Sequence, residues 1–499
     1  MRWDIIIPIV LYLAVVFVIG LYLHRYLTER RRGSFQEAFF IGDRSLGPVI
    51  LAFTLLASMA SAGTFIGAPG VAYDVGFGWA LVVMAQIGAG FYVLGILGKK
   101  FAIVARKLHA VTTTDLLFAR YRSALVVVGS TIGILLFISA YMVAQFAGGA
   151  RIVQGVTGMP YQAGVLIFGL VVIGYTTIGG FRAVALTDAI QGVLMIVGGV
   201  VLWIAFLART DGFGAVINEL AAKQPEMLTI PGPLGLNPAV MFSYFILFGI
   251  AAIGLPHAAV RGMAFRDSMS MHRAMMISLP IMALFSFFFV TLGVAMRVLY
   301  PNAQEPDAVL PTFIVESLPG WLAGLILAAP LAAMMSTVDS FLLVMSSAIV
   351  KDVYLNYINQ EASDTAVSRL SYFSTLIIGG AVVVVSLTPP AYVQFVVVFA
   401  LGGLQSMFIA PIVFGLFWKR ATKWGAIASM YSGLVCYLVL EVFFPDLFGG
   451  IINLVPALVL SIVAMVVVSL LTPRPSGEII QVFWGRTVRP AEREAAPGS

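Results

Sequence analysis

The chain has 499 residues, of which 60% are hydrophobic and only 10% are charged. Its mean hydropathy of +1.00 is far above that of soluble domains, so the composition excludes an ordinary soluble protein and predicts a polytopic membrane protein. The net charge of +6 comes without the polybasic segment of a nucleic-acid-binding protein, and the single cysteine, Cys436, excludes an intrachain disulfide and a thiolate metal cluster.

Apolar segments of about 20 residues recur along the chain and predict thirteen membrane-spanning helices. The first, near residues 5–24, runs into Arg30, Arg31 and Arg32 and lacks the cleavage site of a signal peptide. Most of the 29 Lys and Arg residues, Arg261 among them, fall in alternate loops, which is the pattern of cytoplasmic loops. The N-terminus is therefore predicted to be external and the C-terminus cytoplasmic.

Two segments outside the predicted spans stand out. The longest external loop, residues 210–238, contains several prolines and is expected to form a short helix near residues 215–223. The tail after Pro473 is expected to be flexible.

The second predicted span, residues 46–72, contains a run of small residues from Ala57 to Gly63. Such a run lets helices pack closely, but residues that are expected to interrupt the helix follow it: Gly67, Pro69 and Gly70. A second candidate break lies in the seventh span, at Gly249, Gly254, Pro256 and His257. Broken spans mark transporter sites, because unwound backbone frees carbonyl groups for a cation and helix ends for an anion. Two breaks five spans apart predict inverted five-helix repeats.

A stripe of small and hydroxyl residues runs along the ninth predicted span. Ala333, Ser336, Thr337 and Ser340 share one face of a helix, with Asp339 on its flank. Hydroxyls in a membrane helix often bond back to the carbonyl four residues earlier, which is the alternative interpretation. Because an ionisable side chain within a span is costly and marks an ion or substrate pathway, the stripe is interpreted as a cation site with oxygen ligands.

A second acidic residue, Asp188, lies near the start of the sixth predicted span. A carboxylate in the first turn of a helix is stabilised by the helix dipole. This structural interpretation and a role in the ion pathway are equally compatible with its position.

Polar residues near the middle of the broken spans and their neighbours are candidates for binding an organic solute. Each of them alone is more often a hydrogen bond between helices than a ligand. The candidates are Ser61, Thr64, Gln86, Tyr141, Gln145, His257 and Gln405.

Two stretches resemble the sodium:solute symporter family: GGFRAVALTDAIQG, residues 179–192, and AAMMSTVDS, residues 332–340. The resemblance implies an all-α polytopic protein with the LeuT-type fold, two inverted five-helix repeats and three additional helices. It divides the chain into an N-terminal helix and basic loop, a first repeat, an external loop, a second repeat, two C-terminal helices and a cytoplasmic tail. Their respective bounds are 1–45, 46–207, 208–238, 239–417, 418–472 and 473–499.

The resemblance also implies ligands for the coupling ion. In the family a sodium ion is bound by backbone carbonyls of the first core helix together with a carbonyl and hydroxyls of the eighth. The matching residues are Ala57, Ala60, Ala333, Ser336 and Thr337. Some relatives bind a second cation, and here that site would combine Asp188 with Ser336, Asp339 and Ser340. Those relatives have a hydroxyl where this chain has Asp339, so its carboxylate is expected to hold a cation, to carry a proton or only to accept a hydrogen bond.

The activity that the resemblance implies is sodium-coupled uptake by alternating access in a bacterial inner membrane, with Na⁺ as the coupling ion. Stretches 95–123, 159–169 and 254–273 are most similar to family members that take up pantothenate, which implies pantothenate or a similar small carboxylate as the solute. Another carboxylate or an amino acid is the alternative, and a sodium-independent uniporter or channel is the alternative from a different class. No enzyme motif is found, and neither a nucleic acid nor an obligatory protein partner is expected.

Overall fold

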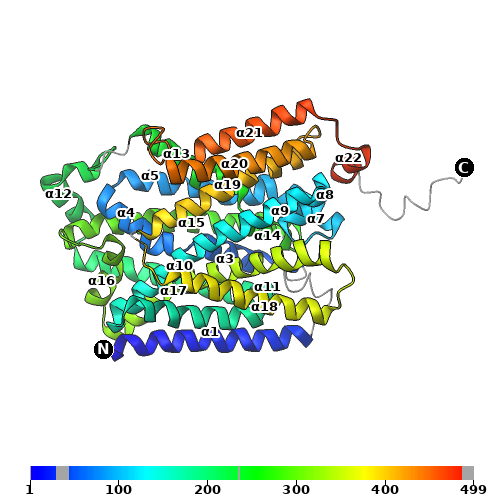
Figure 1. Cartoon of the computed structure of the whole chain (residues 1–499). Coiled ribbons are helices and arrows are strands. Elements are labelled where there is room, and N and C mark those ends of the chain that lie inside the picture. Colours follow the sequence, from blue (N-terminus) through cyan, green and yellow to red (C-terminus); the bar gives the residue numbers. More distant parts are fainter. Residues whose placement is uncertain (1, 30–43, 234–236, 391, 486–499) are drawn as a thin grey trace, which may run out of the picture.

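In the described part of the computed structural model, all regular elements are helices. The structure describes residues 2–29, 44–233, 237–390 and 392–485. Figure 1 shows helices packed side by side with their long axes roughly aligned; α1 (Trp3–Glu29) lies along one edge, and α20 (Lys423–Phe443) and α21 (Leu454–Leu471) lie along the opposite edge. The basic loop expected around Arg30 to Arg32 and the end of the tail lie outside the described residues.

The other helices follow in chain order, and short π-helical or 3₁₀ segments carry η labels. The first half contains α3 (Pro48–Met59), η2 (Gly63–Gly67), α4 (Ala68–Val75), α5 (Gly78–Met84), α6 (Gln86–Gly90), η3 (Phe91–Gly98), α7 (Lys99–Leu108), α8 (Thr113–Tyr121), α9 (Ala124–Gly133), η4 (Ile134–Ile138), α10 (Ser139–Thr157) and α11 (Tyr161–Arg209). The second half contains α12 (Phe213–Lys223), η5 (Pro225–Leu228), α13 (Pro238–Phe248), η6 (Ile250–Gly254), α14 (Pro256–Ala264), α15 (Ser268–Leu299), η7 (Pro306–Ala308), α16 (Val309–Ser317), α17 (Gly320–Ser347), η8 (Ala348–Ile358), α18 (Asp364–Ser386), α19 (Val393–Phe417) and α22 (Gly477–Trp484).

Ten helical segments of the described chain are long and apolar enough to cross a membrane, and an eleventh span is formed if a bent pair is counted as one. Two further apolar helices are shorter, at Pro48–Ala57 and Tyr161–Thr177. They coincide with two of the thirteen expected spans, but their length does not establish that they cross, so the count of thirteen stays a prediction.

Helix α11 consists of two arms, Tyr161–Thr177 and Val184–Arg209, and its backbone is helical throughout. The two arms nevertheless run in opposite directions. Close pairs along them are Gly169 with Val383, Ile173 with Gly379, Gly198 with Ala329, and Asp188 with Ser340 through Arg261. The first arm is therefore antiparallel to α18 and the second is antiparallel to α17. Helices α17 and α18 are consecutive in the chain and pack together, and each arm of α11 packs along one of them. The two arms therefore match the separate spans expected at residues 161–178 and 185–207.

The second span is broken at Ala60 and Ser61, between α3 and the helical turns that follow. The expected position of the break, at Gly67, Pro69 and Gly70, is wrong, because all three residues lie in helical backbone. Pro69 lies where the π-helical turn of η2 passes into α4, with the N–H of Ala68 bonded to Gly63 O, and the helical backbone continues through it.

Of three other predicted features, the structure confirms two and contradicts one. The break in the seventh span is confirmed, because α13 with η6 and α14 are bent by 47° where Pro256 begins a new helix. The short helix in the external loop is also confirmed, as α12. The expectation that the whole tail is flexible is wrong, because α22 forms in it.

Helix α17, which carries the hydroxyl stripe, lies in the centre of the protein. In its most apolar stretch 83% of the residues are buried, against 22% for α1 and 28% for α21. Its neighbours include α1, α10, α11 and α18. The hydroxyl stripe therefore faces other helices and not lipid.

Asp307, in the loop before α16, links two helices at one end of the molecule. Its Oδ2 accepts a hydrogen bond from the N–H of Val393, the first residue of α19, at 3.0 Å. Its Oδ1 packs against Gly70 of α4, where a Cβ atom would approach it to 2.5 Å. Burial raises the pKa of Asp307 to about 6, although the Val393 N–H and the charge of Arg151 act in the opposite direction.

Replacing Asp307 with Asn is expected to remove a pH dependence of stability. Because the folded-state pKa exceeds the unfolded value of 3.8, the folded state binds the extra proton, and this contribution to stability is lost as the pH rises from about 4 to 6. Well above pH 6 the Asp307→Asn variant should be more stable by about 3 kcal/mol, and near pH 4 it should match the wild type. Thermal unfolding measured across this range checks it; a difference that stays constant with pH would contradict the expectation.

Candidate functional site

The end of α3 leaves two backbone carbonyl groups without helical partners. The helix stops at Met59, and Ala60 has an extended backbone with φ −75° and ψ 126°. The N–H of Ser61, which would bond to Ala57 O in a continuous helix, donates instead to Thr64 Oγ1 at 3.3 Å. The N–H of Thr64 bonds to Ser61 O at 2.9 Å, so it does not reach Ala60 O. The carbonyls of Ala57 and Ala60 are therefore available to groups outside the helix.

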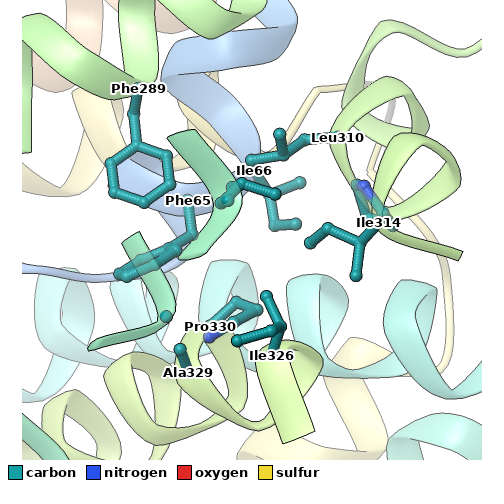
Figure 2. Close-up of a pocket in the computed structure, with 11 residues that line it drawn as sticks. Phe65, Ile66, Phe289, Leu310, Ile314, Ile326, Ala329 and Pro330 are labelled. Carbon is teal, nitrogen blue, oxygen red and sulfur yellow. The ribbon is translucent and has the colours of Figure 1, made fainter. Parts of the chain in front are cut away.

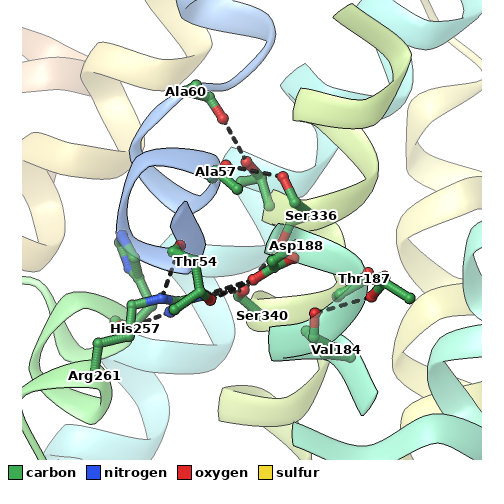
Figure 3. Close-up of polar contacts among 12 residues, drawn as sticks. Thr54, Ala57, Ala60, Val184, Thr187, Asp188, His257, Arg261, Ser336 and Ser340 are labelled. Carbon is green, nitrogen blue, oxygen red and sulfur yellow. Dashed lines mark hydrogen bonds and ion pairs between the residues drawn. The ribbon is translucent and has the colours of Figure 1, made fainter. Parts of the chain in front are cut away.

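Helix α17 supplies hydroxyl groups to these carbonyls. Ser336 Oγ lies 2.8 Å from Ala57 O and 2.9 Å from Ala333 O. Thr337 Oγ1 lies 3.2 Å from Ala60 O and 2.9 Å from Ala333 O. Figure 3 shows Ala57, Ala60 and Ser336 converging where α3 ends beside α17. The structure thus brings together all five residues expected to bind the cation.

The cluster of three carbonyl and two hydroxyl oxygens is neutral and buried. None of its five residues is more than 5% exposed. Neutral oxygens suit a hard monovalent cation and bind it weakly enough for release, whereas a Ca²⁺ site needs several carboxylates. Within the described ranges, no three His, Cys, Asp or Glu side chains gather as a possible metal site.

Apolar side chains pack tightly next to the first break, on the side of η2. Phe65 and Ile66 of η2 face Phe289 of α15 and the α17 residues Ala329 and Pro330 across a cavity of about 10 Å³ (Figure 2). The ring centroids of Phe65 and Phe289 are 4.4 Å apart. A cavity of this size holds one water at most, and its apolar lining offers that water no partner, so this packing excludes solvent.

A buried ion pair lies one turn beyond the oxygen cluster along α17. Arg261 Nη2 donates to Ser340 Oγ at 2.7 Å and lies 3.4 Å from Asp188 Oδ2. Thr54 Oγ1 donates to the same carboxylate oxygen at 2.6 Å, and Thr54 O accepts from Arg261 Nε at 3.2 Å. The Arg261 and Asp188 side chains are 1% and 0% exposed. The network, drawn in Figure 3, joins α3, α11, α14 and α17.

The burial of Arg261 overturns its expected place in a cytoplasmic loop. The chain resumes a helix at Pro256, so Arg261 belongs to α14, and its Nη1 donates to His257 O at 3.0 Å. One signal in the sequence pointed to this partner: a carboxylate such as Asp188 within a span requires a cationic or hydrogen-bonding group nearby.

Asp339 makes its described hydrogen bonds with residues other than the two with which it was expected to form a second cation site. Its Oδ2 accepts from the Tyr175 hydroxyl and its Oδ1 accepts from the Thr176 hydroxyl, both on the first arm of α11. Asp188 and Ser340 meet at the guanidinium group described above and not at Asp339. In this arrangement the guanidinium group of Arg261 lies between Asp188 and Ser340.

The first break collects most of the candidate solute ligands. The Tyr141 hydroxyl donates to Ser61 Oγ at 3.4 Å, and Thr64 Oγ1 accepts from the Ser61 N–H as described. Gln145 Oε1 accepts a hydrogen bond from the N–H of Ala62 at 2.8 Å. Gln145 thus caps the start of the helical turns that follow the break.

The second break contributes the remaining candidates. The His257 ring lies edge-on to Tyr141, with centroids 6.4 Å apart, so the two breaks approach each other here. Gln405 Nε2 donates to Leu247 O at 2.9 Å, and its buried Oε1 has no partner in the described part of the chain. Gln86 is partly buried in α6, which packs against η6.

Gln394, near the start of α19, is a polar residue that the sequence interpretation missed. Its side chain is 3% exposed, and among the described residues its Oε1 has no hydrogen-bond partner. It packs on Gly63 and Gly67, where Cβ atoms would come within 3.1 and 2.7 Å of Oε1. A glutamine at the edge of an apolar span carries no sequence signal that separates this position from ordinary helix packing.

A broken helix whose end carbonyls face the hydroxyls of a central helix, with a second broken helix beside it, is the arrangement of a secondary transporter. A model of the sodium:solute symporter family matches residues 39–433, and the chain belongs to this family. It is therefore a multi-pass membrane transporter that couples solute movement to Na⁺, and it is not an enzyme.

Named relatives are similar over nearly the whole chain. The sodium/pantothenate symporter of Escherichia coli K12 is 41% identical over 469 residues, which cover 94% of this chain and 96% of the relative. The sodium/pantothenate symporter of Haemophilus influenzae is 39% identical, with 94% and 96% covered. The sodium/proline symporter of Haemophilus influenzae is 29% identical, with 94% and 95% covered.

Solved structures establish the fold. A Na⁺-coupled sialic acid symporter in a substrate-bound outward-open state superposes with a TM-score of 0.79 at 19% identity, covering 95% of this chain and 98% of that one. The nucleobase-cation symporter Mhp1 superposes with a TM-score of 0.56 at 18% identity, covering 89% and 97%. The fold is therefore the LeuT-type fold.

Removing one hydroxyl from the oxygen cluster is expected to weaken sodium activation selectively. Ser336→Ala should raise the sodium concentration for half-maximal transport roughly 10-fold, because a hydrogen-bonding group that binds a charge contributes about 1.5 kcal/mol. Ser347→Ala is the matched control, since Ser347 is buried in the same helix and bonds back to Val344 O at 2.7 Å. Equal sodium responses of the two variants would contradict the site.

If Asp188 and Arg261 form a buried ion pair, removing one charge should destabilise the protein more than removing both. Asp188→Asn leaves a buried guanidinium without its carboxylate and should lower stability by about 3 kcal/mol. The double variant Asp188→Asn with Arg261→Gln removes both charges and should recover most of this loss, because replacing a whole buried pair is often neutral. Thermal unfolding in detergent measures both variants; a double variant less stable than either single variant would contradict the pairing.

Proposed function

We propose that this symporter takes up pantothenate by coupling its entry to inward sodium flow. The support is the near-complete coverage by two relatives named sodium/pantothenate symporters, at 41% and 39% identity. The observation that carries the proposal is the first break, where a cation site and uncharged solute-binding groups lie on adjacent residues. Pantothenate has one carboxylate, one amide and two hydroxyls, which such groups can bind.

The carboxylate is proposed to bind at the start of the helical turns after the first break. The N–H groups of Ala62 and Gly63 are now satisfied by Gln145 Oε1 at 2.8 Å and Ser61 Oγ at 3.1 Å. These partners are neutral side chains, so a carboxylate can replace them and gain charge-assisted hydrogen bonds at the positive end of the helix. Tyr141 and His257 then lie beside the hydroxyl and amide part of the solute.

Sodium and solute are proposed to be coupled through the same short segment. A cation bound to Ala57 O and Ala60 O fixes the end of α3 against α17, which also fixes Ser61 and Ala62 for the solute. Binding of either ligand therefore favours binding of the other. The buried Arg261–Asp188 pair, one turn along α17, is proposed to close the exit on the cytoplasmic side.

The orientation and the repeats belong to the same proposal. The distribution of Lys and Arg supports an external N-terminus and a cytoplasmic C-terminus in a bacterial inner membrane. The proposed repeats are residues 46–207 and 239–417, each beginning with a broken span. Residues 1–45 and 418–472 contribute the additional helices, with residues 208–238 as the external loop and 473–499 as the cytoplasmic tail.

One specific observation favours a second candidate. The 29% identical sodium/proline symporter covers the chain as completely as the pantothenate relatives do. Sodium-coupled uptake of an amino acid, or of another small carboxylate, is therefore the alternative.

Uptake of radiolabelled pantothenate into proteoliposomes tests the proposal. An inward sodium gradient should drive accumulation above equilibrium, and an equal potassium gradient should not. Pantothenol, which has an alcohol in place of the carboxylate, should compete roughly 10 to 100 times more weakly than pantothenate, because it loses a charge-assisted contact. Sodium-driven uptake of proline, with no uptake of pantothenate, would support the alternative. Pantothenate uptake at the same rate with and without a sodium gradient would overturn the coupling.

A further inference from the structure

A basic pocket lies where α8, the start of α20 and the linker before α22 meet. Its volume is about 400 Å³, and four of its lining residues are cationic: Arg120, Arg122, Lys423 and Arg474. None of them takes part in the sodium or solute sites. The pocket lies at the end of α20 that carries Lys423, and close to the point where α21 ends at Leu471.

Arg120 is buried at the pocket with its charge uncompensated by any described carboxylate. It is 1% exposed, and its Nε donates to Gly415 O at 2.9 Å. Its Nη2 is directed at further backbone carbonyls, among them Ala421 O at 3.0 Å. Its Nη1 has no hydrogen-bond partner within the described residues, although burying an unsatisfied charged donor is costly. Because Arg120 also lines the pocket, an acceptor that enters the pocket from outside the chain meets a cation that no described carboxylate neutralises.

Aromatic side chains of α22 hold the guanidinium of Arg120 in place. The centre of this group lies 5.4 Å from the ring centroid of Trp484 and 5.7 Å from that of Phe483. Lys100 Nζ lies 4.6 Å from the same Trp484 ring. Such cation–π contacts orient cations without neutralising them. Helix α22 thus covers one side of the pocket and leaves its positive charge intact.

The other cations are exposed and only one of them is paired. Arg122 Nη2 lies 2.7 Å from Glu478 Oε1, an ion pair at the surface. In the described ranges, neither Lys423 nor Arg474 forms an ion pair, and both are exposed. With one carboxylate against four cations, the pocket carries a net positive charge that suits an anion.

The position of the pocket matches the headgroup region of a membrane. Lys423 and Trp424 begin α20, and Trp424 is 49% exposed. Tryptophan and lysine at the ends of spanning helices mark the interface between lipid and water. An anion in this pocket is therefore within reach of the lipid leaflet on the same side.

We propose that the pocket binds the phosphate of an anionic phospholipid headgroup, with Arg120 Nη1 as the buried donor and Lys423 and Arg474 as the outer cations. A phosphate oxygen accepts the hydrogen bonds that the guanidinium otherwise lacks, and its charge balances the pocket. A soluble phosphate has the same chemistry, but the exposed tryptophan beside the pocket favours a lipid.

Lipid binding to the purified full-length protein in detergent tests the proposal. Native mass spectrometry should show retained phosphatidylglycerol but not phosphatidylcholine on the wild type. The double variant Lys423→Ala with Arg474→Ala should bind phosphatidylglycerol roughly 30-fold more weakly, which is the effect expected for two interfacial cations. Both positions are exposed, so the double variant is expected to fold, whereas a change at the buried Arg120 tests folding as well as binding.

Arg369→Ala is the matched control, since Arg369 is an exposed arginine in the first turns of α18 and does not line the pocket. It should bind phosphatidylglycerol within about twofold of the wild type. An equal loss in the control would indicate general surface charge and overturn the site, as would equal retention of the two lipids. Displacement of the lipid by millimolar inorganic phosphate would assign the pocket to a soluble anion and also overturn the lipid proposal.

Discussion

Two carbonyl groups at the end of α3, those of Ala57 and Ala60, have no N–H donor in their own helix. In a membrane interior an unsatisfied backbone group costs several kcal/mol, so something must bind them. The hydroxyls of Ser336 and Thr337 do so, each also in contact with Ala333 O. These two hydroxyls hold the broken helix against the central helix, and in the proposed mechanism a sodium ion replaces their hydrogen bonds to the two carbonyls.

In the proposed mechanism the break serves both ligands, because a helix end and a helix start lie next to each other. The end would provide carbonyl oxygens for the cation, and the start would provide the N–H groups of Ala62 and Gly63 for the anion. Gln145 and Ser61 occupy these donors with neutral groups. The Arg261–Asp188 pair adds a fixed connection between four helices at the next turn of α17, where both charges are fully buried.

The sequence predicted the class of protein, the second break and the face of α17 that carries the ligands. These features depend on local rules: composition, the helix start at Pro256 and the spacing of hydroxyls along one helix. The first break was expected beyond its true position, because helical backbone continues through Pro69 from η2 into α4, and Gly67 and Gly70 serve close packing against Gln394 and Asp307.

Tertiary contacts account for what the sequence did not predict. In the sequence, Arg261 looks like a basic loop residue that follows an apolar segment. Only the structure shows that α14 continues through it. The hydrogen bonds of Asp339 come from Tyr175 and Thr176, which lie on the first arm of α11, whereas Asp188 lies on the second. Helix α22 is eight residues long and has no strong signal of its own, yet its rings pack on Arg120.

Hydrogen–deuterium exchange of the purified protein, with sodium and with potassium, tests the central claim most directly. Sodium should slow exchange of the backbone amides between Ala57 and Thr64, where the ion would fix the end of α3, and should leave the distant helix α12 unchanged. Ser336→Ala should abolish the difference between the two ions. Identical exchange at the break in sodium and in potassium would contradict the account.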